Sequence, residues 1–144
     1  MFFAPLQWTS QRACSLDFYR EFGRPYDLQV LQSLRGADFN MLHVCGNENM
    51  LELLLDYPVH ALNWADQGGG NLSLAEVRAL TDKTLIGGVA HDRMMELTTD
   101  EVGQQVAAAL AVGETHLMVA GGCGISPLTP AATKQAVVAA VRGG

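Results

Sequence analysis

The sequence predicts an α/β protein built on a parallel β-sheet, and three observations support this fold class. Short apolar runs of strand length recur along the 144 residues. Stretches with helical signals lie between these runs, so strands and helices alternate. The runs are apolar throughout, as in parallel strands that helices cover on both faces. We therefore expect one domain, residues 1–144, in which helices pack on a parallel sheet.

The predicted strands and the first helices follow from hydrophobic spacing. Five apolar runs are predicted as strands: residues 2–8, 39–44, 61–64, 84–89 and 116–120. Apolar residues at helical spacing fill residues 15–34, and Gly23-Arg24-Pro25 should end one helix there and begin a second. Asn47 is predicted to cap a helix over residues 50–55.

The later helices have recognisable beginnings. Ser73 with Glu76, and Thr98 with Glu101, have the spacing of capping boxes, in which each side chain bonds the other residue's free backbone N–H. Thr129-Pro130 predicts an N-cap followed by proline at the first helical position. Each of these signals precedes an apolar stretch, so each marks the start of a predicted helix.

Composition excludes several classes of partner. The chain is 49% hydrophobic and 17% charged, its net charge is -6, and its Lys and Arg residues do not cluster, which argues against nucleic acid and anionic membranes as partners. The apolar runs are far shorter than the ~20 residues that span a bilayer. The first eight residues lack the features of a signal peptide, and three cysteines are too few for a disulfide framework, so we expect a cytoplasmic protein with free thiols.

Polar residues and glycines gather where the predicted strands end. They are His43, Cys45, Asp66, Gly87, Gly88, His91 and Cys123. The carboxyl ends of parallel strands lie on one side of the sheet, and active sites occur there in barrels and in open parallel sheets. We therefore expect these residues to share one functional face.

His43, Cys45 and Cys123 form an H-x-C…C set of one imidazole and two thiols. Three such ligands suit zinc with one coordination position left open, which is typical of catalytic rather than structural zinc sites. Cys14 lies in a different kind of segment and is expected to pack beside a helix start. The alternative is that the two cysteines and the histidine are inert core residues, since cysteine is often buried.

Five segments carry a resemblance to a known family: residues 2–8, 19–27, 42–47, 62–66 and 122–130. Together they resemble the uroporphyrinogen decarboxylase superfamily, whose members are (β/α)8 TIM barrels. The segments look like the C-terminal part of that barrel, about five βα units. A complete barrel needs ~250 residues, so the resemblance implies that about three strands of the front half lie outside this chain.

Two motifs place the resemblance within the superfamily. In the decarboxylases the glycine-rich segment near the C-terminus typically reads G-H-G, and here Cys123 stands at the position of that histidine. The decarboxylases also lack the H-x-C pair, which supplies two zinc ligands in the corrinoid-linked methyltransferases that methylate coenzyme M. The resemblance therefore implies zinc held by His43, Cys45 and Cys123, a small thiol substrate, and a separate methylcorrinoid (methylcobalamin) protein as methyl donor.

Asp66 is the candidate catalytic carboxylate. It is predicted to be either a fourth, oxygen ligand that substrate displaces or a hydrogen-bond partner of His43. An equally supported alternative is that Asp66 caps the glycine loop at residues 68–70. Gln7 and Trp8 could border the pocket, although Trp8 is expected in the core.

Gly87, Gly88 and His91 are candidates for cofactor or substrate binding. The glycines would let a ligand approach the backbone closely, and tight barrel geometry explains them equally well. His91 either lines the pocket or caps the helix expected to follow it. His60 and His116 precede strands and are expected on the opposite side of the sheet.

Two other functions stay open. The first is uroporphyrinogen decarboxylation, which needs no metal and proceeds by acid/base chemistry and electrostatic stabilisation. The second is that the chain is no enzyme by itself, because part of a barrel leaves open sheet edges and exposed apolar surface that invite pairing. A homodimer that completes the barrel is the partner expected in that case.

Overall fold

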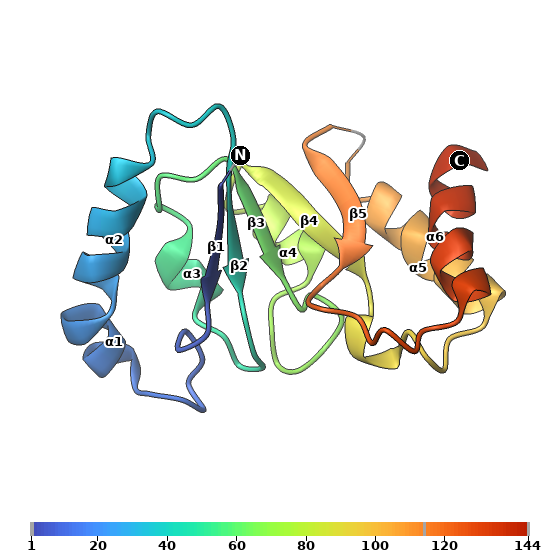
Figure 1. Cartoon of the computed structure of the whole chain (residues 1–144), viewed down its shortest axis with the longest axis horizontal. Helices are drawn as coiled ribbons and strands as arrows, with labels where there is room; N and C mark the ends of the chain where they lie inside the picture. Colours follow the sequence, from blue (N-terminus) through green and yellow to red (C-terminus); the bar gives the residue numbers. More distant parts are fainter. Residues whose placement is uncertain (1, 114, 144) are drawn as a thin grey trace.

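The computed structural model, which describes residues 2–113 and 115–143, contains one sheet of five parallel strands (Figure 1). They are β1 (Phe2–Leu6), β2 (Asn40–Val44), β3 (Ala61–Trp64), β4 (Thr84–Val89) and β5 (Leu117–Gly121). All five predicted strands are confirmed. The spatial order β1-β2-β3-β4-β5 follows the chain, which is the order in a barrel wall, whereas a doubly wound sheet reverses direction.

Helices separate the strands, as predicted. They are α1 (Leu16–Phe22), α2 (Arg24–Ser33), α3 (Leu51–Leu54), α4 (Leu74–Arg78), the 3-10 turn η1 (His91–Arg93), α5 (Thr99–Leu110) and α6 (Ala131–Gly143). The pair α1 and α2 lies beyond β1, and the pair α5 and α6 lies beyond β5 at the other end of the molecule (Figure 1). No helix in the described part of the chain is long and apolar enough to cross a membrane.

Local sequence signals explain most helix boundaries. The break between α1 and α2 falls at Gly23, as predicted, and a Cβ at this position would lie 2.4 Å from the Tyr19 ring. Both predicted capping boxes are confirmed: the side chain of Ser73 begins α4 and that of Thr98 begins α5, each bonded reciprocally with the glutamate three residues later. These caps satisfy backbone N–H groups that have no partner inside the helix.

Two predicted N-caps are wrong. Asn47 does not cap α3; the side chain of Asn49 accepts a hydrogen bond from the Leu51 N–H at 3.2 Å instead. The Thr129 hydroxyl is buried without a hydrogen-bond partner among the described residues, and the first turn of α6 closes from the Lys134 N–H to the Pro130 carbonyl. Both helices begin one residue later than predicted, α3 at Leu51 and α6 at Ala131.

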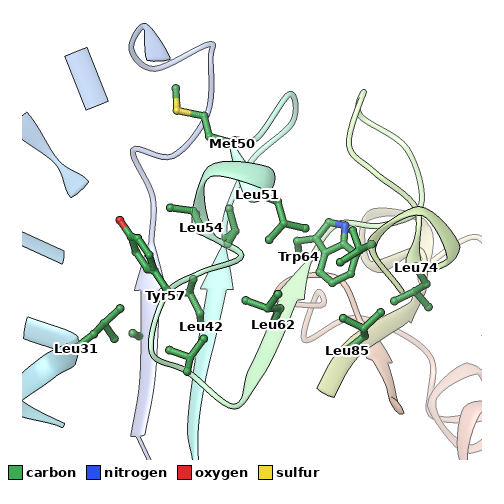
Figure 2. Packing of buried hydrophobic residues seen from close by; sticks show 14 of the residues in the cluster. Leu31, Leu42, Met50, Leu51, Leu54, Tyr57, Leu62, Trp64, Leu74 and Leu85 are labelled. Atoms are coloured by element: carbon green, nitrogen blue, oxygen red, sulfur yellow. The ribbon is translucent and has the colours of Figure 1, made fainter. Parts of the chain in front are cut away.

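One face of the sheet carries the hydrophobic core. Leu42 of β2, Leu62 and Trp64 of β3, and Leu85 of β4 are fully buried there, and Figure 2 shows them beneath α3 and α4. All six α-helices contribute side chains to the core clusters on this side. The Trp64 indole N–H donates to the Leu72 carbonyl at 2.7 Å, which satisfies the only polar atom of this side chain.

None of the helices in the described part of the chain covers the other face of the sheet, so the expectation of helices on both faces is wrong. Strand register aligns one residue from each strand in a row across this face: Pro5, His43, Asn63, Ile86 and Met118. The outer end of the row is open, since Met118 is 51% exposed. In a closed barrel this face is the interior, which explains apolar strands without a second helical layer.

The sheet ends at β1 on one side and at β5 on the other. Trp8 follows β1 and is 72% exposed, so its predicted core position is wrong. It borders a cleft of about 500 Å³ together with Leu6, Phe18 and Phe22. The apolar surface expected at an open edge is therefore present beside β1.

The burial of Leu62 predicts how a substitution there affects the free energy of unfolding. Leu62→Ala is expected to lower the free energy of unfolding by about 2–5 kcal/mol, because it leaves a cavity at a side chain that is fully buried. Leu80→Ala removes the same atoms from a side chain that is 52% exposed and should cost less than about 0.5 kcal/mol. Denaturant unfolding followed by circular dichroism measures both, and equal losses would contradict this packing.

Candidate metal centre

The end of β2 presents His43 and Cys45 on the uncovered face of the sheet. Leu42 and Val44 point into the core, so the alternation of a strand turns His43 to the other side, and Cys45 follows two residues later. The Cys45 N–H donates to the Leu6 carbonyl at 3.0 Å, which continues the β1–β2 pairing one residue past β2. Two of the predicted ligands therefore share a face because of strand geometry alone.

Cys123 reaches the same place from β5, which lies three strands from β2. In a flat sheet three strand spacings amount to about 14 Å, so the sheet must curve and the segment after β5 must turn inward. The Gly122 N–H bonds the Val89 carbonyl at 3.3 Å, and a Cβ on Gly122 would lie 2.6 Å from the Trp64 carbonyl oxygen. The segment thus crosses the end of β3 at a distance that only glycine permits.

These paths bring the three predicted ligands together. The Cys123 Sγ lies 3.3 Å from the His43 Nε2, and the ligand atoms of His43, Cys45 and Cys123 all lie within 4.8 Å of one another. A tetrahedral ion with bonds of about 2.0–2.3 Å needs ligand atoms roughly 3.5–3.8 Å apart. The cluster therefore fits one metal ion after small side-chain movements.

The surroundings of His43 favour a neutral ring. Its side chain is buried, with 7% of the residue exposed, and its ring stacks on that of Phe3 with the centroids 5.8 Å apart. Burial lowers the pKa of His43, although the hydrogen bond from its Nδ1 to the Asn63 Oδ1 (2.6 Å) opposes this effect. A neutral imidazole is the form that binds metal ions.

The surroundings of the Cys45 thiol favour its protonated form. Burial raises the pKa of Cys45, and the nearby Cys123 raises it further. The Cys45 thiol therefore stays protonated at neutral pH when no cation is present. Two half-buried thiols and a buried imidazole around one point form a donor set that suits zinc or another borderline or soft ion.

Asp66 lies outside this cluster. Its Oδ1 and Oδ2 accept the Gly88 N–H at 3.0 and 3.1 Å, and its Oδ2 also accepts from the Gln67 side chain at 3.1 Å. The carboxylate therefore binds a backbone N–H within β4 and not the glycine loop, and the hydrogen-bond partner of His43 is Asn63. Two predicted roles of Asp66, cap of the glycine loop and partner of His43, are wrong. Burial raises the pKa of Asp66, which the bond from the Gly88 N–H partly offsets.

The candidate binding glycines are explained by packing inside the protein. A Cβ on Gly87 would lie 2.5 Å from the Asp66 Oδ1, and a Cβ on Gly88 would lie 2.5 Å from the Ala109 Cβ. Gly88 also has φ of +100°, a conformation that side chains disfavour. Of the two explanations offered for these glycines, tight internal geometry is the one that these contacts support.

His91 begins the turn η1, and a Cβ on Gly121 would lie 3.3 Å from the His91 Cβ, so His91 lies beside the end of β5. The prediction that His91 caps a helix is wrong, because η1 has no side-chain cap and α5 begins only at Thr99. A place for His91 at the border of the site stays a prediction. The other two histidines precede β3 and β5, as expected, so both lie at the opposite ends of the strands.

Asn63 is the residue of this site that the sequence did not predict. It is the one polar side chain in a strand that is otherwise apolar, Ala61-Leu62-Asn63-Trp64, and it is 8% exposed. A buried polar side chain needs hydrogen-bond partners, and these usually have a structural or functional role. This signal is present in the sequence, whereas the neighbour of Asn63 depends on the register of β2 and β3.

The chain is similar to known proteins in sequence and in fold. A family model described as Uroporphyrinogen decarboxylase (URO-D) matches residues 6–144. No curated protein matches the sequence. Among solved structures, a methyltransferase from Methanosarcina mazei is similar with a TM-score of 0.82 and 24% sequence identity. The match covers 98% of this chain and 42% of that one, so the chain spans less than half the length of this structure. The predicted fold class, five βα units of a TIM barrel, is confirmed.

The crossing of Gly122 over β3 can be tested by adding one methyl group. Gly122→Ala is expected to lower the free energy of unfolding by about 1–3 kcal/mol, because the new Cβ would overlap backbone atoms that cannot move aside. Gly124→Ala is the matched control, since a Cβ there has no neighbour within 4 Å. Thermal unfolding of both variants measures the difference, and a Gly122→Ala variant as stable as Gly124→Ala would contradict this backbone path.

Proposed function

The chain belongs to the uroporphyrinogen decarboxylase family, and from that premise we propose that it carries the zinc centre of a methyltransferase that moves a methyl group from a methylcorrinoid protein to a small thiol. The observation that carries the proposal is the convergence of His43, Cys45 and Cys123 within 4.8 Å. The fold shared with the methyltransferase from Methanosarcina mazei supports the same reading.

The protein's own residues supply the ligands and the enclosure of the site. His43 would hold the ion through Nε2, because its Nδ1 is engaged by Asn63. Cys45 and Cys123 would hold it as thiolates, each losing its proton as the ion binds. When bound, zinc supplies Lewis acidity, which favours the ionised, nucleophilic form of a substrate thiol at neutral pH.

The uncovered face of the sheet provides room for the substrates. Three protein ligands leave one coordination position for a thiol. The partly exposed ring of Phe3 stacks on His43 and would exclude water from one side of a bound thiol. Asp66 remains a candidate fourth ligand only if its carboxylate leaves the Gly88 N–H.

Uroporphyrinogen decarboxylation is the second candidate, and the observation that favours it is the description of the matching family itself. It requires no metal and would use acid/base chemistry in the barrel interior. Cys123 stands where the decarboxylases typically carry histidine, which favours the first candidate. The two proposals differ in whether activity depends on the thiols.

The proposed zinc centre predicts the metal content of the purified protein. Protein prepared without chelator should contain about one zinc ion per chain, and His43→Gln, Cys45→Ser and Cys123→Ser should each lose most of it, because three ligands are the minimum for such a site. Metal analysis by mass spectrometry measures this. Cys14→Ser is the control, since the Cys14 thiol lies against the Trp8 carbonyl and outside the cluster. Protein without zinc, or zinc retained in Cys123→Ser, would refute the centre.

The open coordination position predicts a response to thiols. In protein loaded with cobalt(II) in place of zinc, addition of 2-mercaptoethanol should change the visible absorption, because a new sulfur ligand enters at the fourth position. Addition of ethanol at the same concentration is the control. A spectrum that the thiol leaves unchanged would show that the position is closed and would contradict thiol activation.

The two candidate reactions predict different outcomes when the wild-type chain and Cys123→Ala are each incubated with uroporphyrinogen. If the chain is a thiol methyltransferase, uroporphyrinogen should remain unconsumed whether residue 123 is cysteine or alanine, as measured by loss of the substrate in chromatography. Uroporphyrinogen turnover that survives Cys123→Ala would instead establish the decarboxylase.

A further inference from the structure

Asn63 stands beside His43 because of strand register. The two residues are paired partners in the parallel β2–β3 ladder, so their side chains emerge side by side on the uncovered face. Both are buried, with 7% of His43 and 8% of Asn63 exposed. A polar pair in such a position must satisfy its hydrogen bonds internally.

Two carbonyl groups fix the orientation of the Asn63 amide. Its Nδ2 donates to the Ile86 carbonyl of β4 at 2.8 Å and to the Gly121 carbonyl of β5 at 3.2 Å. A carbonyl oxygen only accepts hydrogen bonds, so the NH2 group must face these two atoms and the Oδ1 must face His43. The usual ambiguity between the oxygen and the nitrogen of an amide is therefore removed.

The orientation of the amide determines where the imidazole proton resides. The Asn63 Oδ1 only accepts, so the contact of 2.6 Å requires a proton on the His43 Nδ1. In a neutral ring the Nε2 then carries a free lone pair, and this is the atom that lies 3.3 Å from the Cys123 Sγ. Metal-binding histidines are typically held in this way by an acceptor on the other ring nitrogen.

We propose that Asn63 is the positioning residue of the metal centre, which holds His43 in the Nδ1–H tautomer and anchors the backbone that precedes Cys123. The second role follows from the bond to the Gly121 carbonyl, two residues before that ligand. One amide thus links β2, β4 and the end of β5 to its own strand β3. The proposal rests on the proposed zinc site, but the tautomer can be measured without metal.

The tautomer is tested in the chelator-treated chain labelled with 15N, at a pH where the rings are neutral. Long-range 1H–15N correlation spectra distinguish a proton on Nδ1 from one on Nε2, and His43→Gln assigns the signal among the four histidines. His43 should carry its proton on Nδ1. His60 is an internal control with the opposite expectation, because its Nδ1 accepts the Asn40 N–H at 2.9 Å.

Substitution of Asn63 tests whether this residue determines the tautomer of His43. Asn63→Leu should release the proton of His43 to Nε2 and weaken zinc binding by about 10–100-fold, as expected for loss of an outer-shell partner. Asn40→Leu is the matched control, because it removes a buried amide of β2 that bonds the Leu34 carbonyl. In this variant His43 should keep its proton on Nδ1, and the zinc affinity should stay within about twofold of wild type. Competition with a chromophoric chelator measures the affinity.

A second variant keeps the test decisive if Asn63→Leu does not fold. Asn63→Asp retains an acceptor opposite Nδ1 and loses both N–H donors, so His43 should keep its proton on Nδ1. A proton on Nε2 in the wild type or in Asn63→Asp, or on Nδ1 in Asn63→Leu, would overturn the assignment. A wild-type chain that binds no zinc while His43 carries Nδ1–H would refute the proposed function and still support the role of Asn63 in the tautomer.

Discussion

The curvature of the parallel sheet is the constraint on which the candidate site depends. Strands β2 and β5 have β3 and β4 between them, and strand spacing alone would hold their ends about 14 Å apart. The contact between the His43 Nε2 and the Cys123 Sγ, 3.3 Å, exists because the strands curve as in a barrel wall and the chain turns inward at Gly122. A flat sheet with the same sequence would present the three side chains separately.

The chemistry follows from what the curved sheet encloses. Burial lowers the pKa of His43 and raises the pKa of Cys45, so it favours a neutral imidazole and a protonated thiol, and a cation bound between them would lower the pKa of the thiol by direct coordination. The Asn63 amide is oriented by carbonyl groups of two further strands, so the four strands that form the site also set the tautomer of its imidazole. Fold and metal site are therefore stabilised by the same contacts.

Sequence predicted much of this arrangement, and the failures have a common cause. Strand runs, capping boxes and the rule that parallel strands place their carboxyl ends together identified His43, Cys45 and Cys123, since these signals are local or topological. One of the roles predicted for Asp66, that of hydrogen-bond partner of His43, belongs to Asn63 in the structure, because the partner depends on strand register, which spacing along the chain does not reveal. The exposure of Trp8 likewise depends on which strand lies at the sheet edge.

X-ray absorption at the zinc edge of the metal-loaded chain tests the central claim most directly, because it reports the atoms bound to the ion. We expect two sulfur neighbours at about 2.3 Å, one imidazole nitrogen at about 2.0 Å and one further exchangeable light-atom or thiol ligand. A first shell with three protein sulfurs and no imidazole nitrogen, or one composed of oxygen and nitrogen without sulfur, would contradict a centre built by His43, Cys45 and Cys123.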